Sequence, residues 1–372
     1  MIKPDCRYFN GEKPCKFKRL CEGCDQYSPM GFRILILKLA AMGDVLRTTA
    51  ILEPLKKQYP ASHITWVVDA ASYDLLKKNK YIDRLLTFHS DLRLQLEVEA
   101  FDLALSLDKD PRSAALAMRV NAREKKGFGL SSYGNIFPLN PESQYAFDLG
   151  IDDDLKFKRN RKSYQEIIFE AIGLPYNREP YVLEVDAESA EYASETLKRS
   201  GVHDGSLLVG ICPGAGPLFA NKSWTIEGYA ALIDSLGSLD GVQTILLGGT
   251  AETERNARIK SLARAPVLDA GNHHSIAQFS AIVQRCGLIV CGDTLPMHLA
   301  IGHGRHVLAI FGPTCPQEID LYGRGEIIMS TIECAPCYKR TCDIIEHCMV
   351  QVPAGLVCEK ARNIIETRLR RP

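Results

Sequence analysis

Short apolar runs alternate with helical patterns along most of the chain. Each run has four or five residues and places apolar residues at successive positions, not only at alternate ones. Strands that are apolar on both faces are typical of parallel sheets covered by helices on either side. Alternation of such strands with helices predicts open, doubly wound α/β sheets. The runs lie at 34–37, 65–68, 103–107, 207–211, 244–247, 288–291 and 307–311.

The runs fall into two series, separated near residues 180–205. Pro175, Pro180 and a polar helical stretch at 187–199 mark the break. A chain of 372 residues is longer than one ordinary core requires and suits two domains. We therefore expect two Rossmann-like domains. Their ranges are 33–185 and 186–355, with a cysteine-rich extension at 1–32, a cysteine-rich segment at 334–348 and a C-terminal helix at 356–372.

Composition narrows the class of protein. The 45 basic residues balance the 45 acidic ones, so electrostatics gives no reason to expect nucleic acid as the main partner. No apolar run approaches the length that spans a bilayer, and the polar, cysteine-bearing first thirty residues are unlike a signal peptide. We expect a soluble cytoplasmic protein.

Candidate chemistry begins where the first run ends, because ligands of doubly wound sheets bind at the carboxyl ends of strands. Gly43 permits a tight turn, and Asp44 then stands near the start of a helix expected at about 44–58. Asp44 is either an N-cap, the commoner role of aspartate there, or a carboxylate that accepts a proton from a hydroxyl. Lys38 is either a solvated charge or an anion-binding group beside that carboxylate.

The second series carries two further strand-end segments. Gly214 lies in a glycine-containing turn that lets the backbone approach a phosphate, and Lys222 adds a mobile positive charge. The alternative is an ordinary strand-to-helix turn with a solvated lysine. Asp293 and Thr294 follow the run at 288–291, where either residue is suited to cap a helix whose free amides would hold a diphosphate. His298 then lies inside that helix as a hydrogen-bonded structural histidine.

A fourth turn, formed by Gly312, Pro313 and Thr314, follows the run at 307–311 and is expected to line the same cleft. Taken in order, these segments resemble glycosyltransferase family 9, which contains the ADP-heptose:lipopolysaccharide heptosyltransferases. Leu295 stands where that family usually has glycine. The similar motifs are K-x-x-x-M/L-G-D-V/I-x-x-T at 38–48, P-G-A…K-x-W at 213–224, D-[ST]-G-x-x-H-L at 293–299 and F-G-P-T at 311–314.

The resemblance, which extends from about Ile34 to the C-terminus, implies a GT-B fold with two Rossmann-like domains facing a central cleft. It implies inverting transfer of heptose from ADP-heptose to a saccharide acceptor, in lipopolysaccharide core synthesis, without an essential metal. Asp44 is then the catalytic base, and Lys38 and Arg47 are acceptor-binding. The implied donor-binding residues are Gly214, Lys222, Asp293, Thr294, Gly312, Pro313 and Thr314.

The partners implied are a nucleotide sugar and a lipid-linked saccharide, met at the cytoplasmic face of the inner membrane. The basic run at 156–162 is either an exposed face or a contact for an anionic acceptor, and 152–154 is interpreted as a solvated acidic loop. Three alternatives remain open: a protein heptosyltransferase of the autotransporter type, a sugar-nucleotide epimerase on the same fold, and a non-catalytic metal-bearing protein.

Thirteen cysteines are unevenly distributed. In a cytosolic chain, clustered cysteines suggest metal more readily than disulfides. Four precede the first strand and four follow the last, and each set supplies enough thiols for a tetrahedral zinc or iron site. The alternative is reduced, packed cysteines, as expected for Cys212, Cys286 and Cys291. The sets are Cys6, Cys15, Cys21 and Cys24, and Cys334, Cys337, Cys342 and Cys348. The second resembles a segment of many family members, including iron-binding autotransporter heptosyltransferases.

Overall fold

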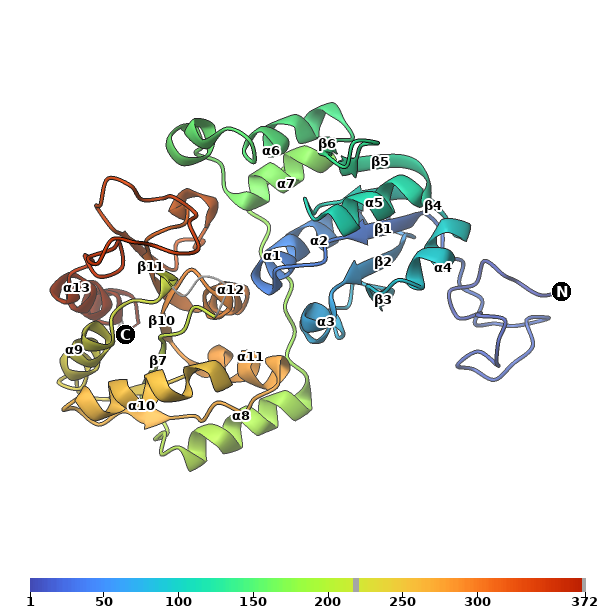
Figure 1. Ribbon diagram of the computed structural model, residues 1–372. Coiled ribbons are helices and arrows are strands. Elements are labelled where there is room, and N and C mark those ends of the chain that lie inside the picture. The colour runs from blue at the N-terminus through green and yellow to red at the C-terminus, as the bar shows by residue number, and fades with distance from the viewer. Residues whose placement is uncertain (217–220, 370–372) are drawn as a thin grey trace. The chain divides into compact units, whose positions relative to one another are not determined.

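The computed structural model describes residues 1–216 and 221–369 and divides into two units (Figure 1). The first unit comprises Met1–Ala41, Thr48–Ile151 and Glu166–Glu179, and the second comprises Met42–Arg47, Asp152–Gln165 and the residues from Pro180 onward. Residues 217–220, inside the motif at 213–224, and residues 370–372, at the end of the expected C-terminal helix, lie outside the described residues.

The first unit is built on a sheet of strand order β3-β2-β1-β4-β5-β6. Its first five strands are parallel, and β6 pairs antiparallel with β5. The strands are β1 (Arg33–Leu37), β2 (His63–Val68), β3 (Arg84–Thr87), β4 (Ala100–Ser106), β5 (Asn121–Leu130) and β6 (Ile136–Pro138). The helices of this half of the chain are α1 (Met42–Thr48), α2 (Leu52–Gln58), α3 (Ala70–Leu76), α4 (Leu92–Val98), α5 (Pro111–Arg119), α6 (Gln144–Asp148) and α7 (Tyr164–Ile172).

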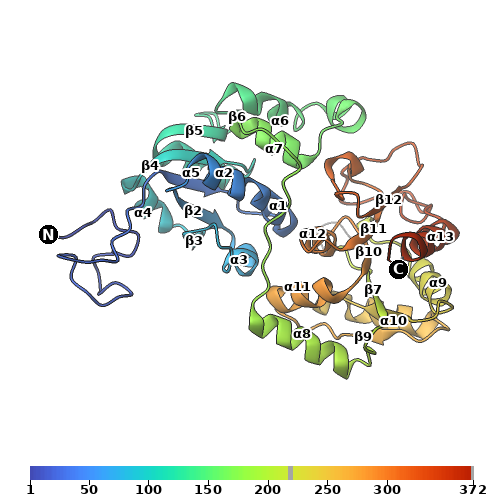
Figure 2. The same cartoon turned by 180° about the vertical axis from the view of Figure 1, so that it is seen from behind.

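The second unit repeats this design with a fully parallel sheet of order β12-β11-β10-β7-β8-β9. One face of this sheet is covered by helices α9, α10 and α13, and the other by α8, α11 and α12. Figure 2 shows the edge strands β9 and β12. The strands are β7 (Leu207–Cys212), β8 (Val242–Leu246), β9 (Leu268–Asp269), β10 (Leu288–Gly292), β11 (His306–Phe311) and β12 (Gly325–Met329). The helices are α8 (Ala187–Arg199), α9 (Ile226–Leu236), α10 (Thr253–Leu262), α11 (Ile276–Arg285), α12 (Leu295–Gly302) and α13 (Ala354–Ile364).

Burial explains why the apolar runs form these sheets. Every residue of β2 and of β10 is buried, so both faces of each strand are covered, as parallel strands between helix layers require. The seven predicted strands are all present, and the predicted α/β doubly wound architecture is confirmed. The edge strands β3, β9 and β12 are only partly buried. They lack long apolar runs, which is why the pattern did not predict them.

Strand order places the loops that carry chemistry. In each sheet the chain runs outward in one direction from a central strand and then returns to that strand's other side, at β4 in the first unit and β10 in the second. The carboxyl ends beside such a reversal form the binding crevice of doubly wound sheets. The residues directly after β1 and β4 therefore lie at the crevice of the first sheet, and those directly after β7 and β10 at the crevice of the second.

The N-terminal extension has little regular structure. Residues 1–32 contain an isolated bridge between Cys6 and Pro29, and Arg7 pairs with Asp83 at 3.0 Å. Of its apolar side chains only Cys6 is buried. None of the helices in the part of the chain that the structure describes is both long and apolar enough to cross a bilayer.

Removing a core side chain from the second sheet should destabilise the protein. Leu308 lies on β11 and is fully buried, so Leu308→Ala leaves a cavity and should cost about 2–5 kcal/mol of unfolding free energy. Leu262→Ala is the matched control, because Leu262 ends α10 with half of its surface exposed. Urea denaturation compares the two, and equal midpoints would contradict the core assignment.

Candidate active site

Helix α1 presents Asp44 in its first turn, as its third residue. The helix begins at Met42, two residues earlier than expected, so Asp44 is not the N-cap. Negative charge in a first helical turn is favoured by the helix dipole. A Cβ atom at Gly43 would overlap the imidazole of His298 on α12. Glycine therefore allows α1 and α12, both in the second unit at these residues, to approach closely.

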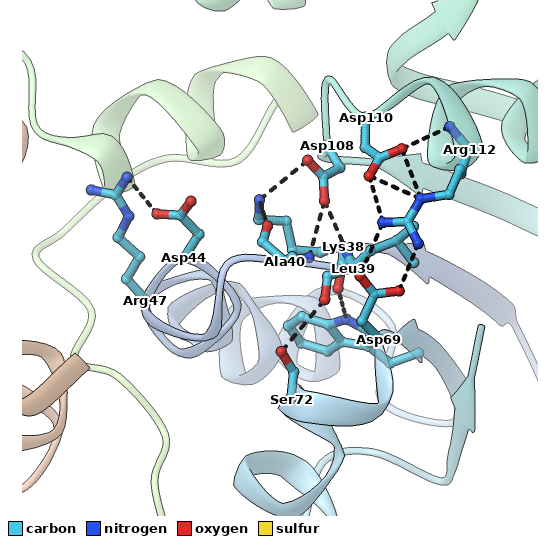
Figure 3. A network of polar contacts seen from close by, with 11 residues as sticks. Lys38, Leu39, Ala40, Asp44, Arg47, Asp69, Ser72, Asp108, Asp110 and Arg112 are labelled. Atoms are coloured by element: carbon cyan, nitrogen blue, oxygen red, sulfur yellow. Dashed lines mark hydrogen bonds and ion pairs between the residues drawn. The ribbon is translucent and has the colours of Figure 1, made fainter. Parts of the chain in front are cut away.

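Arg47, one helical turn after Asp44, is held by three groups. Its Nη2 lies 2.8 Å from Asp44 Oδ1 and 3.9 Å from Glu318 Oε2, and its guanidinium stacks 3.6 Å from the ring centre of Tyr164. The Arg47 side chain is only 10% exposed. Burial alone would lower its pKa, but Asp44, Tyr164 and Glu318 raise it instead. Arg47 is therefore a fixed cation, and Figure 3 shows its pair with Asp44.

A second ion pair joins the loops after β7 and β10. Lys222 Nζ lies 2.8 Å from Asp293 Oδ2, and both side chains are mostly buried. Burial would raise the pKa of Asp293, but the charge of Lys222 and its hydrogen bond to the carboxylate lower it. Thr294 is the N-cap residue of α12 and makes no side-chain capping bond. The amino end of α12, where Leu295 carries the first amide, thus stands next to a mostly buried lysine, an arrangement suited to a phosphate.

His298 lies within α12 and is buried, as the sequence indicated. Its Nδ1 is 3.5 Å from the hydroxyl of Tyr181. Burial and the charge of Arg47 lower the pKa of His298 to about 4, although Asp293 and Asp44 act in the opposite direction. The imidazole is therefore neutral at physiological pH and interacts with both ion pairs without adding a charge.

Gly214 stands beside a pocket of 410 Å³ in the second unit. A Cβ atom at Gly214 would overlap the carboxylate of Glu252, which accepts a hydrogen bond from the amide of Gly249. Glycine is thus needed for Glu252 to reach this wall. The pocket is also lined by Gly216, Ser223, Arg255 and Arg258. The mixture of glycine backbone, carboxylate and guanidinium groups is suited to a polar ligand such as a nucleotide.

The turn formed by Gly312, Pro313 and Thr314 is tied to the C-terminal cysteine segment. The carbonyl of Pro313 accepts hydrogen bonds from the amides of Cys337 and Tyr338, at 3.0 and 2.8 Å. A Cβ atom at Gly312 would press on the side chains of Cys348 and Met349. Thr314 is buried. The cysteine segment therefore fixes the backbone of this turn.

The four C-terminal cysteines lie near one another and form no disulfide. Burial, with smaller contributions from Cys337, Cys342 and Cys334, raises the pKa of the Cys348 thiol to about 11. These four sulfur atoms are thus close enough to interact electrostatically. Among the described residues, however, no group of three or more His, Cys, Asp or Glu side chains is placed to hold a metal ion.

The N-terminal cysteines are also unpaired. Cys6 is buried, whereas Cys15, Cys21 and Cys24 are partly exposed. The backbone amides of residues 17–19 lower the pKa of Cys15. Turns begin at Cys6, Cys15 and Cys21. In each turn the carbonyl of the cysteine accepts a hydrogen bond from the amide three residues later.

Lys38 belongs to a network in the first unit (Figure 3). It is buried, donates to the carbonyl of Ala40 at 2.6 Å and lies 3.5 Å from Asp108 Oδ1. Asp108, which follows β4, also accepts from the amides of Leu39 and Ala40. Lys38 is therefore a paired strand-end charge that holds the loop after β1.

Two cations of the basic run at 156–162, Lys158 and Arg159, pair with the acidic loop before it. Arg159 pairs with Asp152 and Asp154 at 2.7 and 2.8 Å, and Lys158 pairs with Asp154 at 3.2 Å. Lys156 stacks 3.7 Å from the ring centre of Tyr338. The acidic loop at 152–154 thus acts as the counter-charge of the basic run.

The second unit brings together many of the residues singled out in the sequence. Asp44, Arg47, Lys222 and Asp293 all act on the charge of His298. Sequence reasoning missed Glu318 and Tyr164, which hold Arg47, and no motif signals either residue. It also missed Asp108. This residue directly follows the run at 103–107, so inspection of every strand end would have found it.

The depressed pKa of His298 predicts a pH effect on stability. The unfolded imidazole, with a pKa near 6.5, binds a proton that the folded protein rejects until about pH 4, so stability falls as pH drops through this window. In His298→Gln the loss between pH 6.5 and 4 should be smaller. Exposed His203→Gln is the control. Urea midpoints at several pH values measure this, and a slope unchanged by His298→Gln would contradict it.

The chain is similar to known proteins in sequence and in fold. The chain is 23% identical over 311 residues to the lipopolysaccharide core heptosyltransferase OpsX of Haemophilus influenzae, covering 81% of this chain and 84% of that protein. The structure of a family 9 glycosyl transferase from Veillonella parvula matches with a TM-score of 0.73 at 21% identity, covering 90% of this chain and 97% of that one.

Two Escherichia coli structures share the fold. ADP-heptose lipopolysaccharide heptosyltransferase II matches with a TM-score of 0.65 at 19% identity, over 91% of this chain and all of that one. The iron-containing dodecameric glycosyltransferase TibC matches with a TM-score of 0.55 at 13% identity, over 91% of this chain and 76% of that one. These likenesses confirm the expected GT-B class of fold. The family model of glycosyltransferase family 9 (heptosyltransferase) matches residues 90–347, more than half of the sequence, and the chain therefore belongs to that family.

Proposed function

We propose that this enzyme transfers heptose from ADP-heptose to a saccharide acceptor of the lipopolysaccharide core, with inversion at the anomeric carbon. The observation that carries the proposal is the arrangement within the second unit. There, an accessible carboxylate, Asp44, and a phosphate-suited pair, Lys222 and Asp293, both act on one buried histidine, His298. The names of the relatives, which include OpsX and heptosyltransferase II, support the choice of sugar and acceptor.

Asp44 is proposed as the base. Its side chain is 35% exposed, which leaves the carboxylate accessible to a hydroxyl, while Arg47 fixes Oδ1. In the reaction the acceptor hydroxyl passes its proton to Asp44 as its oxygen bonds to the anomeric carbon, and the bond from that carbon to the diphosphate breaks. ADP leaves on the opposite face of the sugar, as inversion requires.

The donor diphosphate is proposed to bind at the amino end of α12. Lys222 would exchange its contact with Asp293 for a phosphate oxygen, and the amide of Leu295, the first residue of α12, would face another oxygen. These groups stabilise the negative charge that develops on the leaving ADP. Gly312, Pro313 and Thr314 complete this donor side, and the pocket beside Gly214 is proposed to take the nucleoside.

The acceptor is proposed to be a lipid-linked saccharide, met at the cytoplasmic face of the inner membrane. Lys38 and Arg47 are proposed to act on the acceptor side, and their pairing with carboxylates suits contacts with sugar hydroxyls as well as with anions. Membership of family 9 favours sugar transfer over the epimerase alternative. A cytoplasmic location accords with a nucleotide-sugar donor.

We also propose that the cysteine sets bind a structural metal ion, iron or zinc, while catalysis needs none. Thiolates are ligands that both ions accept. The effect of Cys334, Cys337 and Cys342 on the thiol of Cys348 supports the C-terminal set, and TibC, which shares the fold, is iron-containing. Binding would draw the four sulfur atoms together and stiffen the turn at Pro313. The set of Cys6, Cys15, Cys21 and Cys24 is the second candidate.

Replacing the proposed base should separate chemistry from binding. Asp44→Asn should lower acceptor-dependent ADP release from ADP-heptose by about a thousandfold or more, because general base catalysis and its supporting contacts are lost together. Binding of ADP, followed as protection against heating, should be nearly unchanged. Exposed Asp153→Asn is the matched control. Wild-type turnover by Asp44→Asn would refute the base, and no ADP release by the wild type with any core acceptor would refute the function.

Metal analysis tests the cysteine proposal. Protein purified without chelator should contain about one iron or zinc ion per occupied cysteine set, and Cys337→Ser should lose the C-terminal ion. Chelation should lower the thermal midpoint without abolishing ADP release from the remaining folded enzyme. Metal-free wild-type protein of unchanged stability would contradict a structural site.

A further inference from the structure

Glu318 is a carboxylate with only 16% of its side chain exposed, to which no motif assigns a role. It ends a short 3₁₀ helix, Pro316–Glu318, directly after the turn at Thr314. Its Oε2 lies 3.9 Å from the same Nη2 atom of Arg47 that is 2.8 Å from Asp44 Oδ1. One guanidinium nitrogen therefore stands between two carboxylates, the proposed base and Glu318, all within the second unit.

The surroundings of this triad come from several elements. Arg47 faces the ring of Tyr164 and acts on His298, while Asp44 acts on His298 as well. Four further groups interact electrostatically with Glu318. They are the cation of Lys156, the carboxylate of Asp293, and the weakly acidic side chains of Tyr338 and Cys315. Burial, together with Asp44 and Asp293, raises the pKa of Glu318 against the lowering effect of Arg47 and Lys156.

A buried arginine has opposite effects on a neighbouring base. It positions the carboxylate, but its positive charge also lowers the carboxylate's affinity for a proton. A general base works best when its pKa lies near the working pH. A second carboxylate near the same guanidinium nitrogen offsets part of that charge and attracts the guanidinium as well.

We propose that Glu318 is a positioning residue for the base: it shares Arg47 with Asp44 and so keeps Asp44 in place and basic enough to accept the acceptor's proton. The proposal rests on the proposed function, in which Asp44 takes that proton while the new glycosidic bond forms and ADP leaves with the electrons of the bond that breaks. Glu318 itself neither gains nor loses a proton in this step.

The pH dependence of turnover tests the proposal. In Glu318→Gln the acidic limb of the kcat/KM profile should move to lower pH by about one unit, and the rate above that limb should fall about three- to tenfold, because Asp44 becomes a weaker base. Glu318→Asp should restore part of the loss. The double variant Arg47→Gln, Glu318→Gln lacks both charges, and the acidic limb of its kcat/KM profile should return toward the wild-type pH.

Glu326→Gln is the matched control, because Glu326 pairs with Lys360 on β12 and α13. Titration of the Asp44 carboxyl carbon by NMR, assigned by comparison with Asp44→Asn, gives the same test without turnover. The pKa of Asp44 should be about one unit lower in Glu318→Gln than in the wild type and in Glu326→Gln. An unchanged Asp44 pKa would overturn the proposal even in an active enzyme, whereas inactivity of the wild type would refute only the proposed function.

Discussion

Burial of the parallel strands on both faces is the constraint on which the rest of this structure depends. Central strands such as β2 and β10 have no exposed residue, so these strands themselves offer no surface for chemistry. The doubly wound order opens a crevice beside the central strand of each sheet, and residues at the ends of the strands lie there. The candidate site in the second unit is built from such loops and from the helices that follow them.

Charge in these crevices is organised in pairs. Lys222 is held by Asp293, Arg47 by Asp44 and Glu318, and Lys38 by Asp108. A buried cation without a partner would be costly, so each cation needs a carboxylate until a ligand replaces it. A chain without net charge can therefore hold the proposed phosphate-binding site, because the positive charges there are local and paired.

Much of the fold and part of the site followed from the sequence. The seven apolar runs predicted central strands because burial on both faces leaves an unbroken apolar pattern, and helix 187–199 matches α8. Edge strands such as β9 have too few buried residues to leave that pattern. Lys222 and Asp293 were singled out because glycine-containing strand ends are typical of phosphate sites, and the structure pairs these two residues. Glu318 could not, because its importance comes from the fold bringing it to Arg47 from far along the chain.

The central claim is that Asp44 activates an acceptor hydroxyl for a single displacement at the anomeric carbon of heptose. The anomeric configuration of the product, determined by NMR after reaction of ADP-heptose with a lipopolysaccharide core saccharide, tests it most directly. The account predicts one added heptose whose anomeric configuration is opposite to that of the donor. A product that retains the donor's configuration would require a second displacement, and would contradict the assignment of Asp44 as the base of an inverting transfer.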